Sequence, residues 1–229
     1  MNRSFPLYPS ARALRRRVRE DGPKSAGRYV AGRLRAQFHE RKQHLVVEKD
    51  LSEIAVPARR GAIRVEPLER RHLPALRELN REREDLTGDV RFAGDVDQGY
   101  GAFVAFRGEE LAGCYWWADG SMPPHRELDT IALGLELDDG DVYGTDFYVL
   151  ERHRAGGTAA DFLFQIETTL REHGFERLWG TVEDVNRSAR WTYAARGYRE
   201  RWAVGSTRVL RRWRHRVETI ETERDGVPA

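Results

Sequence analysis

The pattern of apolar and polar residues is most regular in the second half of the chain, where one stretch has the spacing of a helix. Apolar side chains recur there at i, i+3, i+4, i+7 and i+11, which places them on one face of a helix. These positions are Ala159, Phe162, Leu163, Ile166 and Leu170. Gly174 follows, at a point where a left-handed residue often ends a helix. The pattern therefore predicts an amphipathic helix that ends just before Gly174.

Two apolar stretches of strand length flank this helix. Residues 142–150 precede it and residues 177–182 follow it. A strand, a helix and a second strand in this order imply a crossover between two parallel strands. Between the first strand and the helix lies a turn with two consecutive glycines, Gly156 and Gly157. Because a helix N-terminus has unpaired amides and glycine lets a ligand approach the backbone, this turn favours a phosphate group.

Shorter alternating stretches come before this unit. Residues 63–68, 102–106, 111–117 and 131–137 alternate like strands, and leucines recur at helical spacing over residues 73–79. We therefore expect an α/β (α+β) fold in which a mixed, largely antiparallel sheet is flanked by helices and ends in a parallel strand-helix-strand crossover. The last strand is expected over residues 206–213.

The glycine turn resembles a known phosphate-binding motif. Its spacing is not Gly-x-Gly-x-x-Gly and no Gly-Lys-Ser/Thr follows, which argues against dinucleotide folds and P-loops. Arg154-x-x-Gly157-x-Ala159 instead resembles the Arg/Gln-x-x-Gly-x-Gly/Ala motif of the GCN5-related N-acetyltransferase (GNAT) family. Residues 186–198 are similar to a second motif of that family, Asn-x-x-Ala-x-x-x-Tyr-x-x-x-Gly-Phe/Tyr. The matching residues are Asn186, Ala189, Tyr193, Gly197 and Tyr198. The resemblance covers roughly residues 61–213.

The resemblance implies a site for an acyl carrier, acetyl-CoA. In the family the two strands of the crossover separate, and the pantetheine arm enters between them and pairs with strand backbone. By position, Phe147 and Val149 would offer those backbone groups here. The diphosphate would lie on the amides of the turn, with Arg154 adding a charge-assisted contact. The residues of the turn are Arg154, Ala155, Gly156, Gly157, Thr158 and Ala159; many relatives have Gly where Ala155 stands.

The resemblance also implies catalytic roles. Tyr193 matches the family residue that points its hydroxyl at the thioester sulfur, although a buried helix aromatic would explain it too. Asp146 lies within an apolar strand and could act as the general base or form a salt bridge with an arginine. Glu183 could order a water near the amine or simply be solvated. Asn186 is expected chiefly to cap its helix, with contact to the carrier as the alternative.

Composition sets the class of protein. Of the 229 residues, 40% are hydrophobic and 33% are charged, as in soluble globular proteins. The chain has no run of eighteen apolar residues and no apolar segment after its first arginines, so we expect neither a spanning helix nor a secretory signal. One cysteine, Cys114, cannot form an internal disulfide, which favours the cytoplasm. No His/Cys/Asp/Glu spacing indicates a metal site.

The first fifty residues are unusually basic. They contain thirteen Lys/Arg and five Asp/Glu, and two short helices are expected over residues 11–20 and 25–40. This arm could pack on the domain or on a partner subunit, as in a homodimer, or attach to an anionic membrane surface. Sparse aromatics argue against nucleic acid. We expect an N-terminal extension over residues 1–58, a catalytic domain over 61–213 and a charged tail over 214–229.

The expected function is N-acyl transfer from acetyl-CoA to an amine by direct attack. Two alternatives stay open. The domain could bind acyl-CoA without catalysis, as a sensor or scaffold, or the basic arm could direct an enzyme to a sugar or lipid-linked precursor at the membrane. The sequence does not identify the acceptor, because the family forms that pocket from variable loops, here residues 80–100 and 118–130.

Overall fold

The computed structural model describes most of the chain after residue 38. The described residues are 19, 23–24, 27, 39–54, 62–82, 100–121, 133–209 and 212–219. The chain forms two compact units. The larger contains residues 43–204 and 217–229, and the smaller contains residues 1–42 and 205–216. Every candidate site residue named above belongs to the larger unit.

The described elements are mostly strands. The strands are β1 (His39–Asp50), β2 (Arg64–Pro67), β3 (Gly101–Arg107), β4 (Glu110–Asp119), β5 (Asp141–Val149), β6 (Arg177–Glu183), β7 (Arg199–Val209) and β8 (Arg212–Thr219). The α-helices are α3 (Leu73–Glu82), α5 (Thr158–Glu172) and α6 (Arg187–Ala195), and the 3-10 helices are η1 (Arg70–His72) and η2 (Glu151–His153).

The sheet is mixed, as expected. Its strand order is β2-β3-β4-β5-β6-β1-β7-β8. The pairs β2–β3, β3–β4, β4–β5 and β6–β1 are antiparallel, whereas β5 and β6 are parallel and are joined through α5. The predicted mixed sheet with one strand-helix-strand crossover is therefore confirmed.

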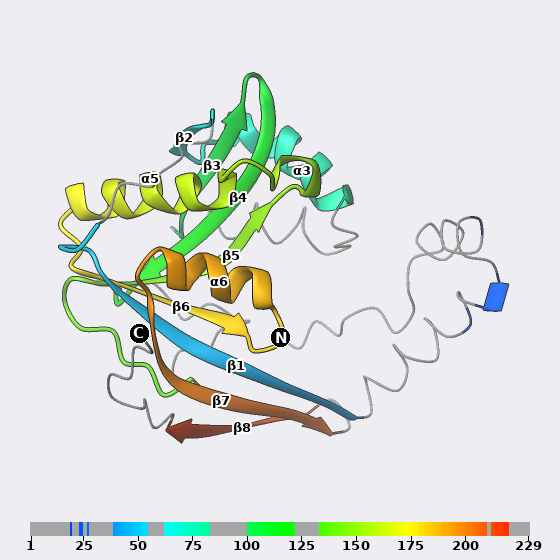
Figure 1. Ribbon diagram of the computed structural model, residues 1–229, viewed down its shortest axis with the longest axis vertical. Coiled ribbons are helices and arrows are strands. Elements are labelled where there is room, and N and C mark those ends of the chain that lie inside the picture. Colours follow the sequence, from blue (N-terminus) through cyan, green and yellow to red (C-terminus); the bar gives the residue numbers. More distant parts are fainter. Residues whose placement is uncertain are drawn as a thin grey trace, which may run out of the picture. The chain divides into compact units, whose positions relative to one another are not determined.

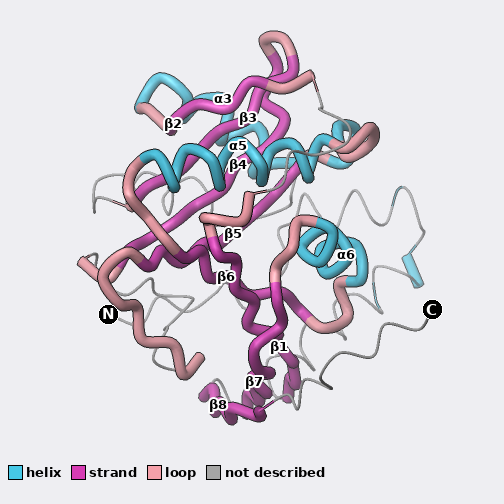
Figure 2. The backbone as a smooth tube through the Cα atoms, turned by 60° about the vertical axis from the view of Figure 1, so that its left-hand side comes forward, coloured by secondary structure: helices cyan, strands magenta, loops and turns pink. Residues whose placement is uncertain are grey.

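Helices cover both faces of the sheet in the larger unit (Figures 1 and 2). Successive residues of β3 show the division: Phe103 belongs to the buried cluster that contains Phe162 of α5 and Tyr193 of α6, while Val104 belongs to the cluster that contains Leu76 of α3. The core thus has an α5/α6 layer on one face and α3 on the other. Gly174, with a φ of 91°, follows the last turn of α5, as the sequence predicted.

An irregular segment covers another part of the face opposite α5 and α6. The strand expected over residues 131–137 is wrong for the described part of that range, because residues 133–137 form no strand. Gly134 has a left-handed φ of 69°, which interrupts an extended chain. Leu133 and Leu135 are buried against Trp179, and the Trp202 indole donates to the Leu133 carbonyl over 2.8 Å.

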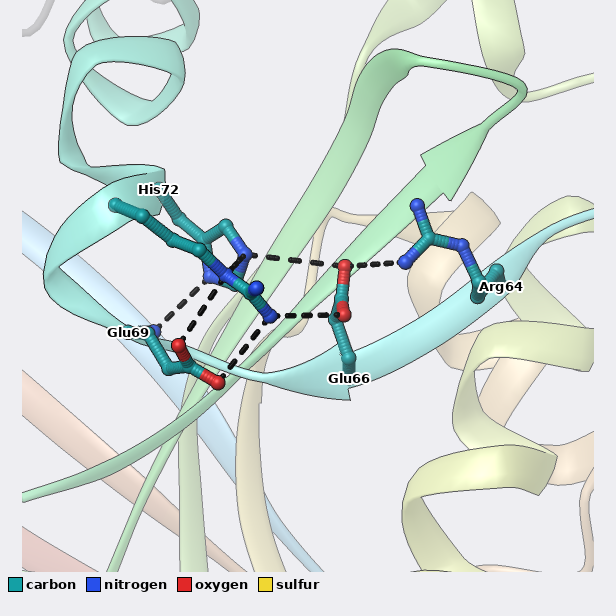
Figure 3. A network of polar contacts seen from close by, with 5 residues as sticks. Arg64, Glu66, Glu69 and His72 are labelled. Carbon is teal, nitrogen blue, oxygen red and sulfur yellow. Dashed lines mark hydrogen bonds and ion pairs between the residues drawn. The ribbon is translucent and has the colours of Figure 1, made fainter.

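The start of α3 is fastened to the edge strand β2 by a polar network (Figure 3). The backbone amide of Glu69 donates to Nδ1 of His72 over 3.0 Å, which caps η1. The Arg64 guanidinium donates to Glu66 over 2.6 Å, and Arg71 lies 3.5 Å from the same carboxylate. The buried His72 ring packs on Phe106, so these contacts fix α3 on its face of the sheet.

The secondary structure on both sides of the predicted domain differs from expectation. Strand β1 was not predicted: residues 44–50 pair with β6, although the sequence placed them in the extension. His39 and Glu40 belong to β1, so the expected second helix runs too far; the rest of both expected helices lies almost wholly outside the described residues. The single strand expected over 206–213 is two strands, and β8 includes residues 214–219 of the predicted tail.

Candidate active site

The parallel strands β5 and β6 are paired only along their first halves. Their backbone pairing runs from Asp141 with Arg177 to Gly144 with Gly180. Strand β5 then continues to Val149 and β6 to Glu183, and the two separate toward their C-terminal ends (Figure 1). Within the described chain, β5 beyond Gly144 therefore has no strand paired on its β6 side.

A bulge in β5 accompanies this separation. Thr145 pairs with Trp116 and Tyr148 with Cys114, so three steps on β5 oppose two on β4. Asp146 lies in the bulge with a φ of 48°, the single positive φ of a non-glycine residue among those described. Such backbone strain costs of order 1–3 kcal/mol and tends to occur at functional sites. The partly buried Asp146 is thus a bulge residue rather than a regular strand position.

The bulge leaves strand backbone facing the separation. Val149 pairs with Gly113, and the next amide, Leu150 N–H, donates to the Ala112 carbonyl over 2.8 Å. In an antiparallel ladder this pattern turns the N–H and C=O of Val149 away from β4. Arg154 Nε donates to the Val149 carbonyl over 2.9 Å. The Val149 amide is therefore the backbone donor directed between β5 and β6.

Arg154 is held against β5. Besides its hydrogen bond to Val149, its guanidinium lies 5.5 Å from the centre of the Tyr148 ring. This arrangement joins the strand to the turn and keeps a cation beside the turn amides. The phosphate contact expected of Arg154 stays a prediction.

The glycine turn presents uncapped amides. Arg154, Ala155, Gly156 and Gly157 are exposed, and the φ angles of Gly156 and Gly157 are 74° and 82°. Gly157 is the N-cap of α5 and supplies no capping side chain. The first hydrogen bond of the helix runs from Asp161 N–H to the Gly157 carbonyl. The amides of Thr158, Ala159 and Ala160 come before it and therefore have no carbonyl acceptor within the helix. These amides and the helix dipole suit an anion.

Two successive hydrogen bonds hold the turn against the interior of the protein. Thr158 is fully buried; its hydroxyl donates to the Ala155 carbonyl over 2.9 Å and accepts from Arg107 over 2.9 Å. Sequence reasoning missed Arg107, because a lone arginine at the end of a strand carries no motif. His153, just before the turn, is buried and lies 3.2 Å from the Glu110 carboxylate.

Helix α6 brings the second motif to the same place. The side chain of Asn186 accepts from Ala189 N–H over 3.1 Å, which confirms its capping role. Tyr193 is buried, with its ring 6.5 Å from Phe147 of the bulge and 4.7 Å from Tyr198. Burial, and then the nearby Glu167 carboxylate, raise the pKa of Tyr193 above its ordinary value of 10.0. The phenol therefore stays protonated and able to donate.

The candidate acids flank the separation of the strands. Asp146 lies in the β5 bulge, and Glu183 is the last residue of β6, paired with His44 of β1. Both are partly buried. Their positions at the diverging ends fit the expected role of a base or a water-ordering group, which stays a prediction for each.

The described part of the chain shows neither a metal-binding cluster nor a helix suited to cross a membrane. No group of three or more His, Cys, Asp or Glu residues there is arranged to hold a metal ion. No helix in those ranges combines the length and the apolar character that a membrane crossing requires.

Comparison with known proteins places this geometry in one family. The family model described as "Acetyltransferase (GNAT) family" matches residues 64–198, more than half of the chain. This range contains the bulge, the glycine turn and α6. No curated protein matches the chain with significance.

Solved structures share the fold at low sequence identity. A GCN5-related N-acetyltransferase from Sphaerobacter thermophilus is 12% identical with a TM-score of 0.51, over 80% of this chain and 55% of that one. A GCN5-related glucosamine N-acetyltransferase region of a fungal multi-domain β-N-acetylglucosaminidase is 14% identical with a TM-score of 0.55, over 93% and 24%. A Staphylococcus epidermidis protein of unknown function is 10% identical with a TM-score of 0.54, over 84% and 68%. The chain thus spans less than two thirds of the first two relatives.

Proposed function

Because the chain belongs to the GNAT acetyltransferase family and is an acyltransferase by that membership, we propose that it moves an acetyl group from acetyl-CoA to an amine by direct attack. One observation carries the proposal: β5 and β6 stop pairing at Gly144 and Gly180, and the unpaired part of β5 runs on to Val149, after which the chain leads to the uncapped N-terminus of α5. A diphosphate on that N-terminus would place a flexible thioester arm along the unpaired edge of β5.

The binding step uses backbone more than side chains. The amides of Thr158, Ala159 and Ala160 and the α5 dipole would hold the diphosphate, with the flanking glycines giving it room. A Cβ placed on Gly156 would meet no atom within 4 Å, which supports an open approach to the turn. The Val149 amide would then pair with an amide carbonyl of the pantetheine arm.

The chemical step is an acyl transfer that needs no metal in this scheme. The neutral amine attacks the thioester carbonyl carbon, a C–N bond forms and the C–S bond breaks. The leaving thiolate takes a proton from the phenol of Tyr193, or a hydrogen bond that stabilises it. The attacking nitrogen gives up its extra proton to Asp146, or through water to Glu183, and from there to solvent. Where the Tyr193 phenol has protonated the thiolate, a proton from solvent restores it.

The test is an acceptor screen that measures CoA thiol release. The panel should include amino sugars, because one solved relative is a glucosamine N-acetyltransferase region, together with polyamines and peptide amines. The proposal expects thiol release that depends on one class of amine and falls in Tyr193→Phe. Binding of acetyl-CoA with no acceptor-dependent release would instead support a catalytically silent carrier-binding domain, and absence of binding would overturn both.

A further inference from the structure

A buried ion pair joins the two helices that carry the site. Glu167 of α5 is fully buried and Arg196, at the end of α6, is 3% exposed. The Arg196 guanidinium contacts both carboxylate oxygens of Glu167. Helix α5 begins at the glycine turn and α6 carries Tyr193, so this pair links the anion-binding end of the site to its phenol.

Arg196 belongs to the turn that fixes Tyr193. The Tyr198 amide donates to the Tyr193 carbonyl and the Gly197 amide to the Ala194 carbonyl, over 3.0 and 2.9 Å. With Gly197 at a φ of 81°, this is a Schellman turn that ends α6. The accompanying side-chain contact is the edge-on packing of Tyr193 on Tyr198. A displacement of Arg196 would therefore also displace Tyr193, which lies three residues before it in the same turn.

A second buried cation approaches the same carboxylate. Lys49 of β1 is 3% exposed, and its ammonium donates to the Glu53 carbonyl over 2.6 Å. A Cβ on Gly197 would lie 3.0 Å from the Lys49 nitrogen, so any other residue there would displace the Lys49 ammonium by a few tenths of an ångström. Glu167 acts on both cations electrostatically.

Stability alone is a poor reason for such an arrangement. Replacing a buried ion pair by apolar residues of similar volume is often neutral or stabilising by about 1–4 kcal/mol, because desolvation offsets the attraction. A pair that joins the two functional helices and lies beside the reactive phenol therefore points to another role.

We propose that the Glu167–Arg196 ion pair is a positioning device for Tyr193, which sets the placement of α6 on α5 and the electric field at the phenol. The inference rests on the proposed role of Tyr193 in acyl transfer. The Glu167 carboxylate of α5 acts on that phenol electrostatically, and Arg196 at the end of α6 and Lys49 of β1 act on Glu167. The titratable phenols around it are Tyr115 from β4, Tyr143 from β5 and Tyr198 beside β7.

The first test is an alkaline absorbance titration, which needs no substrate. The Tyr193 signal is obtained by subtracting the titration of Tyr193→Phe, made in each background. In Glu167→Gln the carboxylate is gone while Arg196 and Lys49 remain, so tyrosinate is favoured and the phenol pKa moves down. Glu200→Gln is the control. Glu200 of β7 forms an ion pair with Arg190 of α6, the helix that carries Tyr193, but this pair is partly exposed. An unchanged Tyr193 titration in folded Glu167→Gln would overturn the inference.

The second test replaces the pair by apolar residues, Glu167→Leu with Arg196→Met, so that packing is retained without the charges of the pair, while Lys49 keeps its hydrogen bond to the Glu53 carbonyl. We expect this variant to fold and bind CoA as the unmodified protein does, while kcat falls about 10- to 100-fold, as for a catalytic group displaced by about 1 Å. Arg196→Lys should retain part of the kcat of the unmodified protein, because lysine keeps the positive charge opposite Glu167. A double variant that folds and turns over normally would show a merely structural pair and overturn the inference.

The two proposals fail in different ways. If the unmodified protein bound no CoA and released no thiol, the proposed acyl transfer would be wrong, yet the absorbance titration would still decide whether Glu167 acts on the Tyr193 phenol.

Discussion

Gly144 and Gly180 are the last paired residues of β5 and β6, and their surroundings differ sharply. A Cβ on Gly144 would lie 1.6 Å from the Tyr115 hydroxyl oxygen, whereas one on Gly180 would meet its nearest atom, in the Val47 side chain, at 3.6 Å. Strand separation thus begins where a tyrosine from β4 is seated against a residue without a side chain.

The first prediction follows from this asymmetry. Gly144→Ala forces the buried Tyr115 ring to move, and overpacking of this kind costs typically about 1–3 kcal/mol. Gly180→Ala makes ordinary contacts and should change the free energy of unfolding by less than about 0.5 kcal/mol. Urea denaturation of the two variants measures the difference. Equal stabilities would mean that Tyr115 does not occupy the space beside Gly144.

The second prediction concerns the anion-binding turn. Gly156→Glu places a carboxylate beside the uncapped α5 amides, where it competes with a diphosphate and repels it. We expect CoA affinity to fall about 100-fold or more, which corresponds to about 2.7 kcal/mol. The matched control is Gly174→Glu at the opposite end of α5, since a Cβ on either glycine meets no atom within 4 Å and both have positive φ. Calorimetry should show that Gly174→Glu binds CoA normally; equal losses in both variants would count against the turn.

The third prediction tests the phenol. Tyr193→Phe removes the donor near the leaving sulfur but keeps the ring, so kcat should fall about 100-fold with little change in KM for acetyl-CoA. Tyr198→Phe is the neighbouring control, whose hydroxyl is also buried. Because burial keeps the pKa of Tyr193 above 10.0, its titration should not reduce kcat below that pH. A normal kcat in Tyr193→Phe would remove the phenol from the mechanism.

The fourth prediction concerns the start of the parallel pair. The buried Asp141 accepts from Arg177 Nε over 2.6 Å and from the Trp179 indole over 3.1 Å. Asp141→Ala leaves both donors without this partner and should lower the free energy of unfolding by about 3 kcal/mol. Asp138 contacts the same arginine but its side chain is 76% exposed, so Asp138→Ala should cost less than about 0.5 kcal/mol. Thermal unfolding would rank the two, and a larger loss in Asp138→Ala would contradict this assignment.

The sequence predicted the elements that local patterns define. The apolar spacing of α5, the glycines at its two ends and the crossover to β6 are all local, and each is present in the structure. The two motifs also placed Tyr193 on a helix that reaches the β5 bulge. The roles assigned to Asp146 and Glu183 stay predictions, because they depend on bound acetyl-CoA and an amine.

Non-local features were missed for physical reasons. The apolar run Leu45–Val47 is short and lies in a basic segment, and only its pairing with β6 makes it part of the sheet. Glu167 and Arg196 are 29 residues apart on different helices, so no spacing rule connects them. The bulge at Asp146 replaces simple alternation with a left-handed residue that pattern reasoning does not anticipate.

Calorimetric titration of CoA into the intact, folded protein is the most direct measurement. Amides at residues 158–160 and the unpaired edge of β5 should give saturable binding at one site per chain, and Gly156→Glu should weaken it about 100-fold or more. Folded protein that takes up neither CoA nor acetyl-CoA would contradict the account at its root.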